Sequence, residues 1–155
     1  MIWVYLALAA SASALLLALF YARQVNNADP GNARMRELMD AIRAGAMAFI
    51  RREYIAVAAF VVVLATLILI FLDYGRPWGA IAYVFGACLS ALAGFVGMRI
   101  ATAANARTTE AARTGGIKAA LPLAFRGGAV MGFTVAGLGL FGLSIGYLVF
   151  VEWLE

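Results

Sequence analysis

The chain of 155 residues has no histidine, one cysteine, and charged residues at only 13% of its positions. The absence of histidine removes the usual proton shuttle and the commonest transition-metal ligand. Cys88 stands alone in an apolar run, which excludes a disulfide framework and a cysteine metal cluster. Soluble domains carry charge on about a quarter of their residues, so this composition does not fit an ordinary soluble protein.

Long hydrophobic runs dominate the chain instead, and 65% of its residues are hydrophobic. A helix needs about 20 apolar residues to cross the hydrocarbon core of a membrane. Four segments meet this requirement, namely residues 2–22, 54–72, 78–98 and 127–151. In a soluble protein, helices apolar on all sides would leave no polar face for water. The sequence therefore predicts an all-α, polytopic membrane protein, with four transmembrane helices in a single membrane segment over residues 1–155.

The positive charges predict how these spans are oriented. Eleven of the twelve arginine and lysine residues lie between the first and second spans or between the third and fourth, whereas Arg76 alone lies between the second and third. Because such residues collect in cytoplasmic loops, we expect two basic cytoplasmic connections and both termini outside. The formal net charge of +4 does not indicate nucleic-acid binding, since these connections offer mostly Ala, Thr and Asn rather than aromatic or base-reading side chains.

The first basic connection contains an amphipathic helix at about residues 33–53. Its apolar residues recur at three- and four-residue spacing and share one face: Met35, Leu38, Met39, Ile42, Ala46, Phe49 and Ile50. Asn32 is a candidate N-cap, and we expect one long helix over 33–72, with a break near Gly45 as an alternative. The apolar face would either dock against other cytoplasmic helices or lie on lipid headgroups, and the spacing does not decide between the two.

The second basic connection is small and polar, and we interpret it as a cytoplasmic loop at about residues 99–126. Gly115 and Gly116 provide a flexible joint, and Pro122 fits the first turn of the fourth helix.

Small residues form stripes along the third and fourth spans. The candidates for helix packing are Gly86, Ser90, Gly97, Gly128, Gly132, Gly139, Gly142 and Gly146. Lipid gives helices no hydrophobic reason to associate, so they pack by close approach over small residues. We therefore expect these positions to contact neighbouring helices rather than to bind a ligand.

Acidic residues are missing from the interior of the spans, because Glu53, Asp73 and Glu152 lie at span edges. Ionisable groups inside a membrane mark ion and proton paths. The sequence also has no paired carboxylates, no Walker-type glycine loop and no nucleophile–base set. We therefore assign no catalytic, substrate-binding or metal-ligating residue to this chain.

Several runs of residues nevertheless carry a family resemblance. They are Gly31-Asn32-Ala-Arg-Met35, Gly45-Ala46-Met-Ala48-Phe49-Ile50-Arg-Arg52-Glu-Tyr54, Gly94-Phe-Val-Gly97-Met98, Ala101-Thr102-Ala-Ala104-Asn105-Ala-Arg107-Thr108, Ala111-Ala112-Arg113, Ala124-Phe125-Arg-Gly127-Gly128-Ala-Val-Met-Gly132 and Gly137-Leu-Gly139-Leu-Phe-Gly142. In order, spacing and placement relative to the spans, they resemble the amino-terminal portion of membrane-bound, ion-translocating inorganic pyrophosphatases.

The resemblance implies a homodimer whose subunits have far more membrane helices than four. It implies hydrolysis of cytoplasmic magnesium pyrophosphate coupled to outward movement of protons or sodium ions, in the cytoplasmic membrane of a prokaryote. Mg²⁺ would serve the full-length parent, and the resemblance leaves the choice of ion and the need for K⁺ open. The family's Asp-rich motifs lie on later helices, and no position here matches them.

By this resemblance the chain is an outer-helix segment that packs as a scaffold and is an enzyme only as part of its parent. Its partners would be the pump's remaining helices, a second subunit and the lipid bilayer. We also expect Arg107, Arg113 and Lys118 to form an electrostatic rim near the entry of an anionic substrate, with positive-inside anchoring as the alternative. A self-contained four-helix scaffold or assembly subunit is the competing interpretation, and a small oligomeric transporter is a third.

Overall fold

A computed structural model describes residues 1–72 and 77–152, and within this part the chain is helical with no strand. Helix α1 covers Ile2–Asn27, α2 covers Ala33–Phe71, and α3 covers Trp78–Tyr147. A short π-helical turn, η1, follows at Leu148–Glu152. Asp73, which was expected to mark the edge of a span, lies outside the described residues.

The long helix expected over 33–72 is present as α2. Asn32 caps it, because its side-chain oxygen accepts a hydrogen bond of 3.0 Å from the backbone N–H of Met35. No break occurs at Gly45, and α2 runs uninterrupted for 39 residues. One glycine costs a helix interior only about 1 kcal/mol, which the rest of α2 outweighs.

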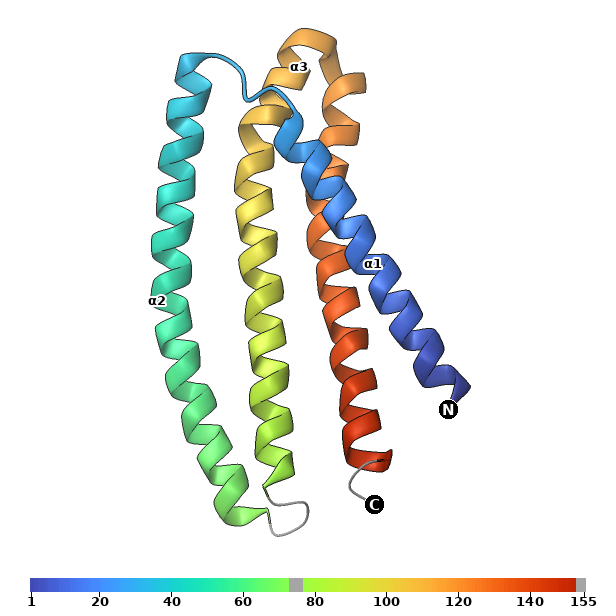
Figure 1. Cartoon of the computed structure of the whole chain (residues 1–155). Coiled ribbons are helices and arrows are strands. Elements are labelled where there is room, and N and C mark those ends of the chain that lie inside the picture. The colour runs from blue at the N-terminus through green and yellow to red at the C-terminus, as the bar shows by residue number, and fades with distance from the viewer. Residues whose placement is uncertain (73–76, 153–155) are drawn as a thin grey trace.

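The connection at residues 99–126, expected as a loop, is helical in the structure apart from one reversal. The segment contains many alanines, and alanine is the strongest helix former. Its small and polar residues had instead suggested a loop. Gly116 has φ 66° and ψ −164°, a conformation that glycine adopts without a steric penalty. Figure 1 shows α3 doubling back in this region, which gives it two antiparallel arms, residues 78–115 and 117–147. Pro122 lies in the second turn after this reversal rather than in the first.

The reversal of α3 lies at the same end of the molecule as the connection between α1 and α2 (Figure 1). The N-terminus and the end of α3 lie at the other end. We call the first of these ends the polar end, because the described hydrogen bonds of Arg107, Glu110 and Arg113 are found there.

The buried core lies where α1 crosses the two arms of α3. Its members are Ala18 and Val25 of α1 and Ile100, Ala104, Leu123 and Val130 of α3. Tyr21 stacks on Phe133 at 6.1 Å between ring centroids. Small alanines at the crossing let these backbones approach closely, as is usual between membrane helices.

Elsewhere the helices expose large apolar side chains. Phe60 of α2 is 64% exposed and Leu143 of α3 is 76% exposed. Within residues 1–72 and 77–152, three helices are long and apolar enough to cross a membrane: α1, α2 and the helix Trp78–Phe150. Apolar surface of this extent needs hydrocarbon or other helices around it, as in a multi-pass membrane protein.

Candidate functional site

Arg107 holds the connection between α1 and α2 onto α3. Its guanidinium donates to the carbonyl oxygens of Ala28 at 3.1 Å and Asn26 at 3.2 Å, and to that of Ala103 at 2.8 Å. The sulfur of Met39 lies 3.4 Å from Nη1, so α2 also contacts this group. Burial lowers the pKa of Arg107, and the nearby charge of Arg43 lowers it further. The planar fork with its five donors suits such a multiple contact, which an ammonium could not reproduce.

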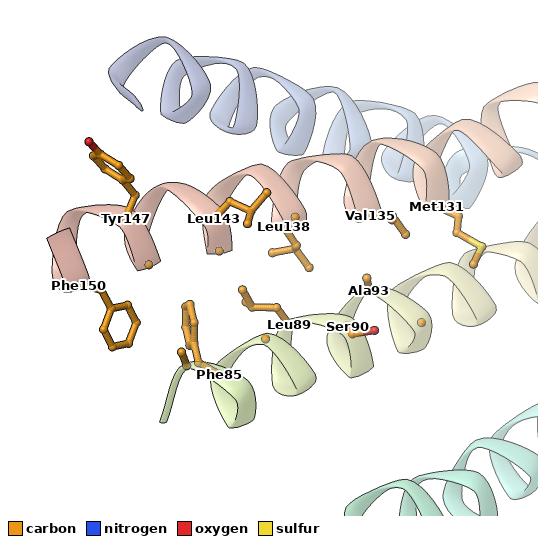
Figure 2. Close-up of a pocket in the computed structure, with 16 residues that line it drawn as sticks. Phe85, Leu89, Ser90, Ala93, Met131, Val135, Leu138, Leu143, Tyr147 and Phe150 are labelled. Carbon is orange, nitrogen blue, oxygen red and sulfur yellow. The ribbon is translucent and has the colours of Figure 1, made fainter. Parts of the chain in front are cut away.

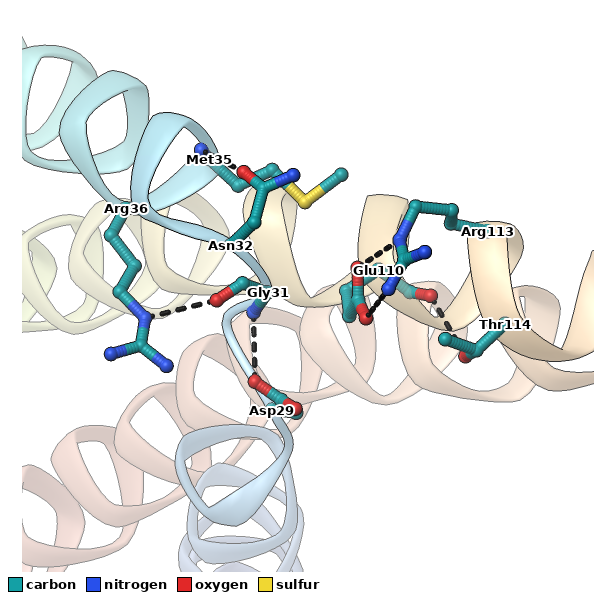
Figure 3. A network of polar contacts seen from close by, with 8 residues as sticks. All are labelled: Asp29, Gly31, Asn32, Met35, Arg36, Glu110, Arg113 and Thr114. Carbon is teal, nitrogen blue, oxygen red and sulfur yellow. Dashed lines mark hydrogen bonds and ion pairs between the residues drawn. The ribbon is translucent and has the colours of Figure 1, made fainter.

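Glu110 supports the same connection one helical turn further along α3. It is buried, with 7% of its surface exposed. Arg113 donates two hydrogen bonds to it, of 2.8 and 2.7 Å, which Figure 3 shows as a bidentate pair. These hydrogen bonds lower the pKa of Glu110 and raise that of Arg113.

Gly31 rests directly on Glu110. A Cβ added at Gly31 would collide with the sulfur of Met35 and lie 3.1 Å from a carboxylate oxygen of Glu110, and Gly31 has φ 87°. Its N–H donates to Asp29 and its carbonyl oxygen accepts from Arg36 (Figure 3). Only glycine fits this turn without strain, both for space and for conformation.

The three residues expected to form an electrostatic rim therefore have different surroundings. Arg107 is committed to backbone carbonyl oxygens, and Arg113 pairs with Glu110 while 59% of its side chain stays exposed. Lys118 is exposed beyond the reversal at Gly116. Arg107 and Arg113 thus lie on the first arm of α3, whereas Lys118 lies on the second, just past the reversal.

The small residues expected to pack helices also divide into two groups. Gly97 packs against Met131, whose Cγ would lie 2.7 Å from an added Cβ, and Gly142 packs against Leu89 at 2.8 Å. Both contacts join the two arms of α3. An added Cβ would meet nothing within 4 Å at Gly86, Gly128, Gly132, Gly139 and Gly146. Ser90 is exposed, so these positions have open space within the described part of the chain.

Three further close contacts between helices involve residues that were not among the expected packing positions. Gly137 lies against α1, where an added Cβ would be 2.8 Å from Leu15 and 3.3 Å from the carbonyl oxygen of Ser11. The buried hydroxyl of Ser11 donates to the carbonyl oxygen of Gly137 at 2.7 Å. Gly127 approaches Ala104, and the hydroxyl of Tyr54 donates to the carbonyl oxygen of Ala91. The spacing of small residues indicates such contacts, but only the fold selects which glycines make them.

The apolar face of the helix at 33–53 is partly covered in the structure. Met39 and Ile50 are buried, whereas Leu38, Ile42 and Phe49 are 49%, 46% and 57% exposed. Part of this face therefore docks within the chain, and the rest is open.

No metal centre is found in the described residues, which contain no group of three His, Cys, Asp or Glu side chains that could hold an ion. The carboxylate of Glu110 is engaged by Arg113, and Asp29 accepts from Gly31. Mg²⁺ in proteins is held by carboxylates and substrate phosphates, and the acidic residues described here do not converge in that way. We assign no metal-binding role to them.

The fold and these contacts define a multi-pass helical membrane protein whose polar side chains hold helices together. A model of the inorganic H⁺ pyrophosphatase family matches residues 12–154. The chain belongs to this family, which confirms the resemblance found in the sequence.

Three relatives show how far the similarity extends. The chain is 43% identical over 136 residues to a K(+)-insensitive pyrophosphate-energized proton pump of Methanosarcina mazei, covering 88% of this chain and 20% of that protein. It is 42% identical over 141 residues to the pump with the same description in Pyrobaculum aerophilum, covering 89% and 20%. It is 43% identical over 125 residues to a K(+)-stimulated pyrophosphate-energized sodium pump of Thermotoga maritima, covering 80% and 17%. The chain thus spans about a fifth of the length of these relatives.

Proposed function

We propose that this chain is the amino-terminal outer-helix segment of a pump that couples hydrolysis of inorganic pyrophosphate to transport of protons or sodium ions. The observation that carries this proposal is the similarity over nearly the whole chain to pumps of which it spans about a fifth. In this proposal the segment is not catalytic and serves as a packing scaffold. Mg²⁺, and K⁺ where it is needed, act in the remaining part of the parent.

The contacts of the polar side chains support a scaffold role. Arg107, Glu110 and Ser11 are each engaged in holding one helix or connection against another. Groups committed in this way are unsuited to general acid–base work, which needs a group free to exchange a proton with substrate.

We propose four membrane crossings, with both termini outside and both basic connections in the cytoplasm. The two arms of α3 have 38 and 31 residues, from Trp78 to Gly115 and from Ile117 to Tyr147. At 1.5 Å per residue they reach about 57 and 46 Å, so each exceeds a hydrocarbon core of about 30 Å. The eleven basic residues of the two connections then lie on one side of the membrane, as the positive-inside rule requires.

Within the parent, we propose a homodimer in a prokaryotic cytoplasmic membrane. Arg107, Arg113 and Lys118 would add a cationic rim at the cytoplasmic side, where pyrophosphate enters. The exposure of Lys118 and of much of Arg113 supports this part of the proposal. Replacing all three by neutral residues in the parent pump should weaken its affinity for pyrophosphate. An unchanged affinity would exclude a role for these residues as a cationic rim.

The function is tested with the complete product of the coding sequence, reconstituted in vesicles. Adding magnesium pyrophosphate should release phosphate and, at the same time, build a proton or sodium gradient, measured with a pH-sensitive dye and with ²²Na⁺. A product that ends at Glu155, is stably inserted and causes neither event would favour the competing interpretation, a self-contained four-helix scaffold or assembly subunit.

A further inference from the structure

A groove runs between the two arms of α3 on the side away from the polar end. It has a volume of about 860 Å³, and every described residue that lines it belongs to α3 or η1. Figure 2 shows Phe85 and Leu89 of the first arm facing Val135, Leu138 and Phe150, which lie on the second arm and its extension. Neither α1 nor α2 contributes to it. The groove follows residues 82–94 of the first arm, which is about 18 Å of helix.

The groove is open to its surroundings, since Val135 and Leu143 in its lining are 50% and 76% exposed. In a membrane such an apolar surface is covered by lipid chains or by another helix. The surface of the groove is almost entirely apolar. Among the described residues that line it, only Ser90 and Tyr147 carry a hydroxyl, and Tyr147 lies at the end of the groove. Its occupant is therefore apolar, and it lies at the depth of the membrane.

The glycines of the groove favour a helix over lipid chains as the occupant. Gly86, Gly139 and Gly146 line the groove, and a Cβ at any of them would meet nothing within 4 Å. Backbone exposed along two neighbouring arms permits the close approach of a third helix, which is how helices associate in lipid.

The hydroxyl of Ser90 also favours a helix as the occupant of the groove. Thr66, Thr134 and Ser13 each donate to the carbonyl oxygen four residues earlier in their own helix. In the described part of the chain Ser90 has no such hydrogen bond, and its side chain lies at the groove (Figure 2). A lipid tail has no acceptor for this hydroxyl, and an unsatisfied polar group in hydrocarbon is unfavourable. A helix can supply a carbonyl oxygen or a polar side chain.

We propose that this groove receives a transmembrane helix from the part of the pump that follows this chain, with a hydrogen-bond acceptor on that helix facing Ser90. The inference rests on the proposed function, because the matched residues make up only 20% of these relatives, which therefore have further polypeptide to fill the space. The groove is thus a docking surface for the rest of the same protein.

The test places a photoreactive probe in the groove of the complete pump. In a Cys88→Ala background, Val135→Cys is labelled with a short diazirine maleimide, because Val135 lines the groove and is 50% exposed. The matched control is Ala136→Cys, which is also exposed but does not line the groove. Both labelled pumps are first assayed for pyrophosphate hydrolysis. They are then irradiated, and the crosslinked peptides are identified by mass spectrometry.

We expect the probe at position 135 to be found on a peptide beyond residue 155 of the same polypeptide, and the probe at 136 not to be found on that peptide. A second variant, Ser90→Ala, should lower the melting temperature of the intact pump. Crosslinks from position 135 to lipid alone, or to a second copy of this segment, in a pump that still hydrolyses pyrophosphate would overturn the inference and leave the proposed function standing. Absence of hydrolysis in the unlabelled complete product would instead contradict the proposed function.

Discussion

At the scale of single residues, Arg107 joins the end of α1 and the connection that follows it to α3. Its partners Asn26 and Ala28 lie 81 and 79 residues away in sequence. The sequence showed a positive charge on a basic connection, and from this charge we expected a rim. The carbonyl oxygens that engage Arg107 could not be predicted, because every residue has one and only the fold decides which of them converge.

We predict that Arg107→Ala lowers the free energy of unfolding of the chain by about 2 kcal/mol, since hydrogen bonds to a charged group are lost at three carbonyl oxygens. Arg107→Lys should recover little of this, because an ammonium cannot reproduce the planar fork. Unfolding in detergent micelles, followed by circular dichroism, measures the effect. Lys118→Ala is the control and should leave stability unchanged, and equal losses in the two alanine variants would refute the role of Arg107.

Glu110 makes the stability of the polar end depend on pH. Its pKa in the folded chain is lowered from 4.5 by the hydrogen bonds from Arg113, so the ionised carboxylate stabilises the fold. This stabilisation is complete above the unfolded pKa and is lost as the pH falls through the lowered folded value. Glu110→Gln should therefore be less stable than the parent sequence at neutral pH.

The difference in melting temperature between the two chains should shrink as the pH is brought below 4.5. A difference that stays constant over this range would show that the contribution of Glu110 does not depend on its charge.

At the scale of elements, the amphipathic pattern and the cap at Asn32 were sufficient to predict α2. The pattern also predicted an apolar face, although Met39 and Ile50 are covered and Leu38 is not. The segment at 99–126 was misjudged because small polar residues suggested a loop, whereas its alanines form helix on both sides of Gly116. The groove between the arms of α3 could not be predicted, because it depends on how the arms are spaced after the reversal.

The contact between α1 and α3 predicts that two glycines on the second arm of α3 differ in their effect on stability when replaced by alanine. Gly137→Ala should destabilise the chain by about 1–3 kcal/mol, because its Cβ would crowd Leu15 and the backbone of Ser11. Gly132→Ala, five residues earlier, meets nothing within 4 Å and should be neutral or slightly stabilising, since alanine is the better helix former. The same unfolding assay compares them. Similar effects from both substitutions would mean that α1 does not lie on Gly137.

At the scale of the whole molecule, the proposed topology places the two basic connections on one side of the membrane. In a Cys88→Ala background, single cysteines at Arg34 and Lys118 should both react with an impermeant maleimide only from the cytoplasmic side. A cysteine at Ile2 should react from the outside. Arg34 is suitable because its ion pair with Glu37 is exposed, and such pairs contribute little to stability. Reaction of positions 34 and 118 from opposite sides would exclude four crossings with both termini outside.

The central claim is that the chemistry of the pump lies outside this chain, whose polar side chains are committed to holding its own helices together. Composition already pointed this way, since acidic residues are few and scattered, and in the structure Glu110 pairs with Arg113. The most direct measurement is phosphate release from magnesium pyrophosphate by the 155-residue chain alone, reconstituted in vesicles. The account predicts no turnover above that of empty vesicles, and hydrolysis that follows the amount of the purified chain would contradict it.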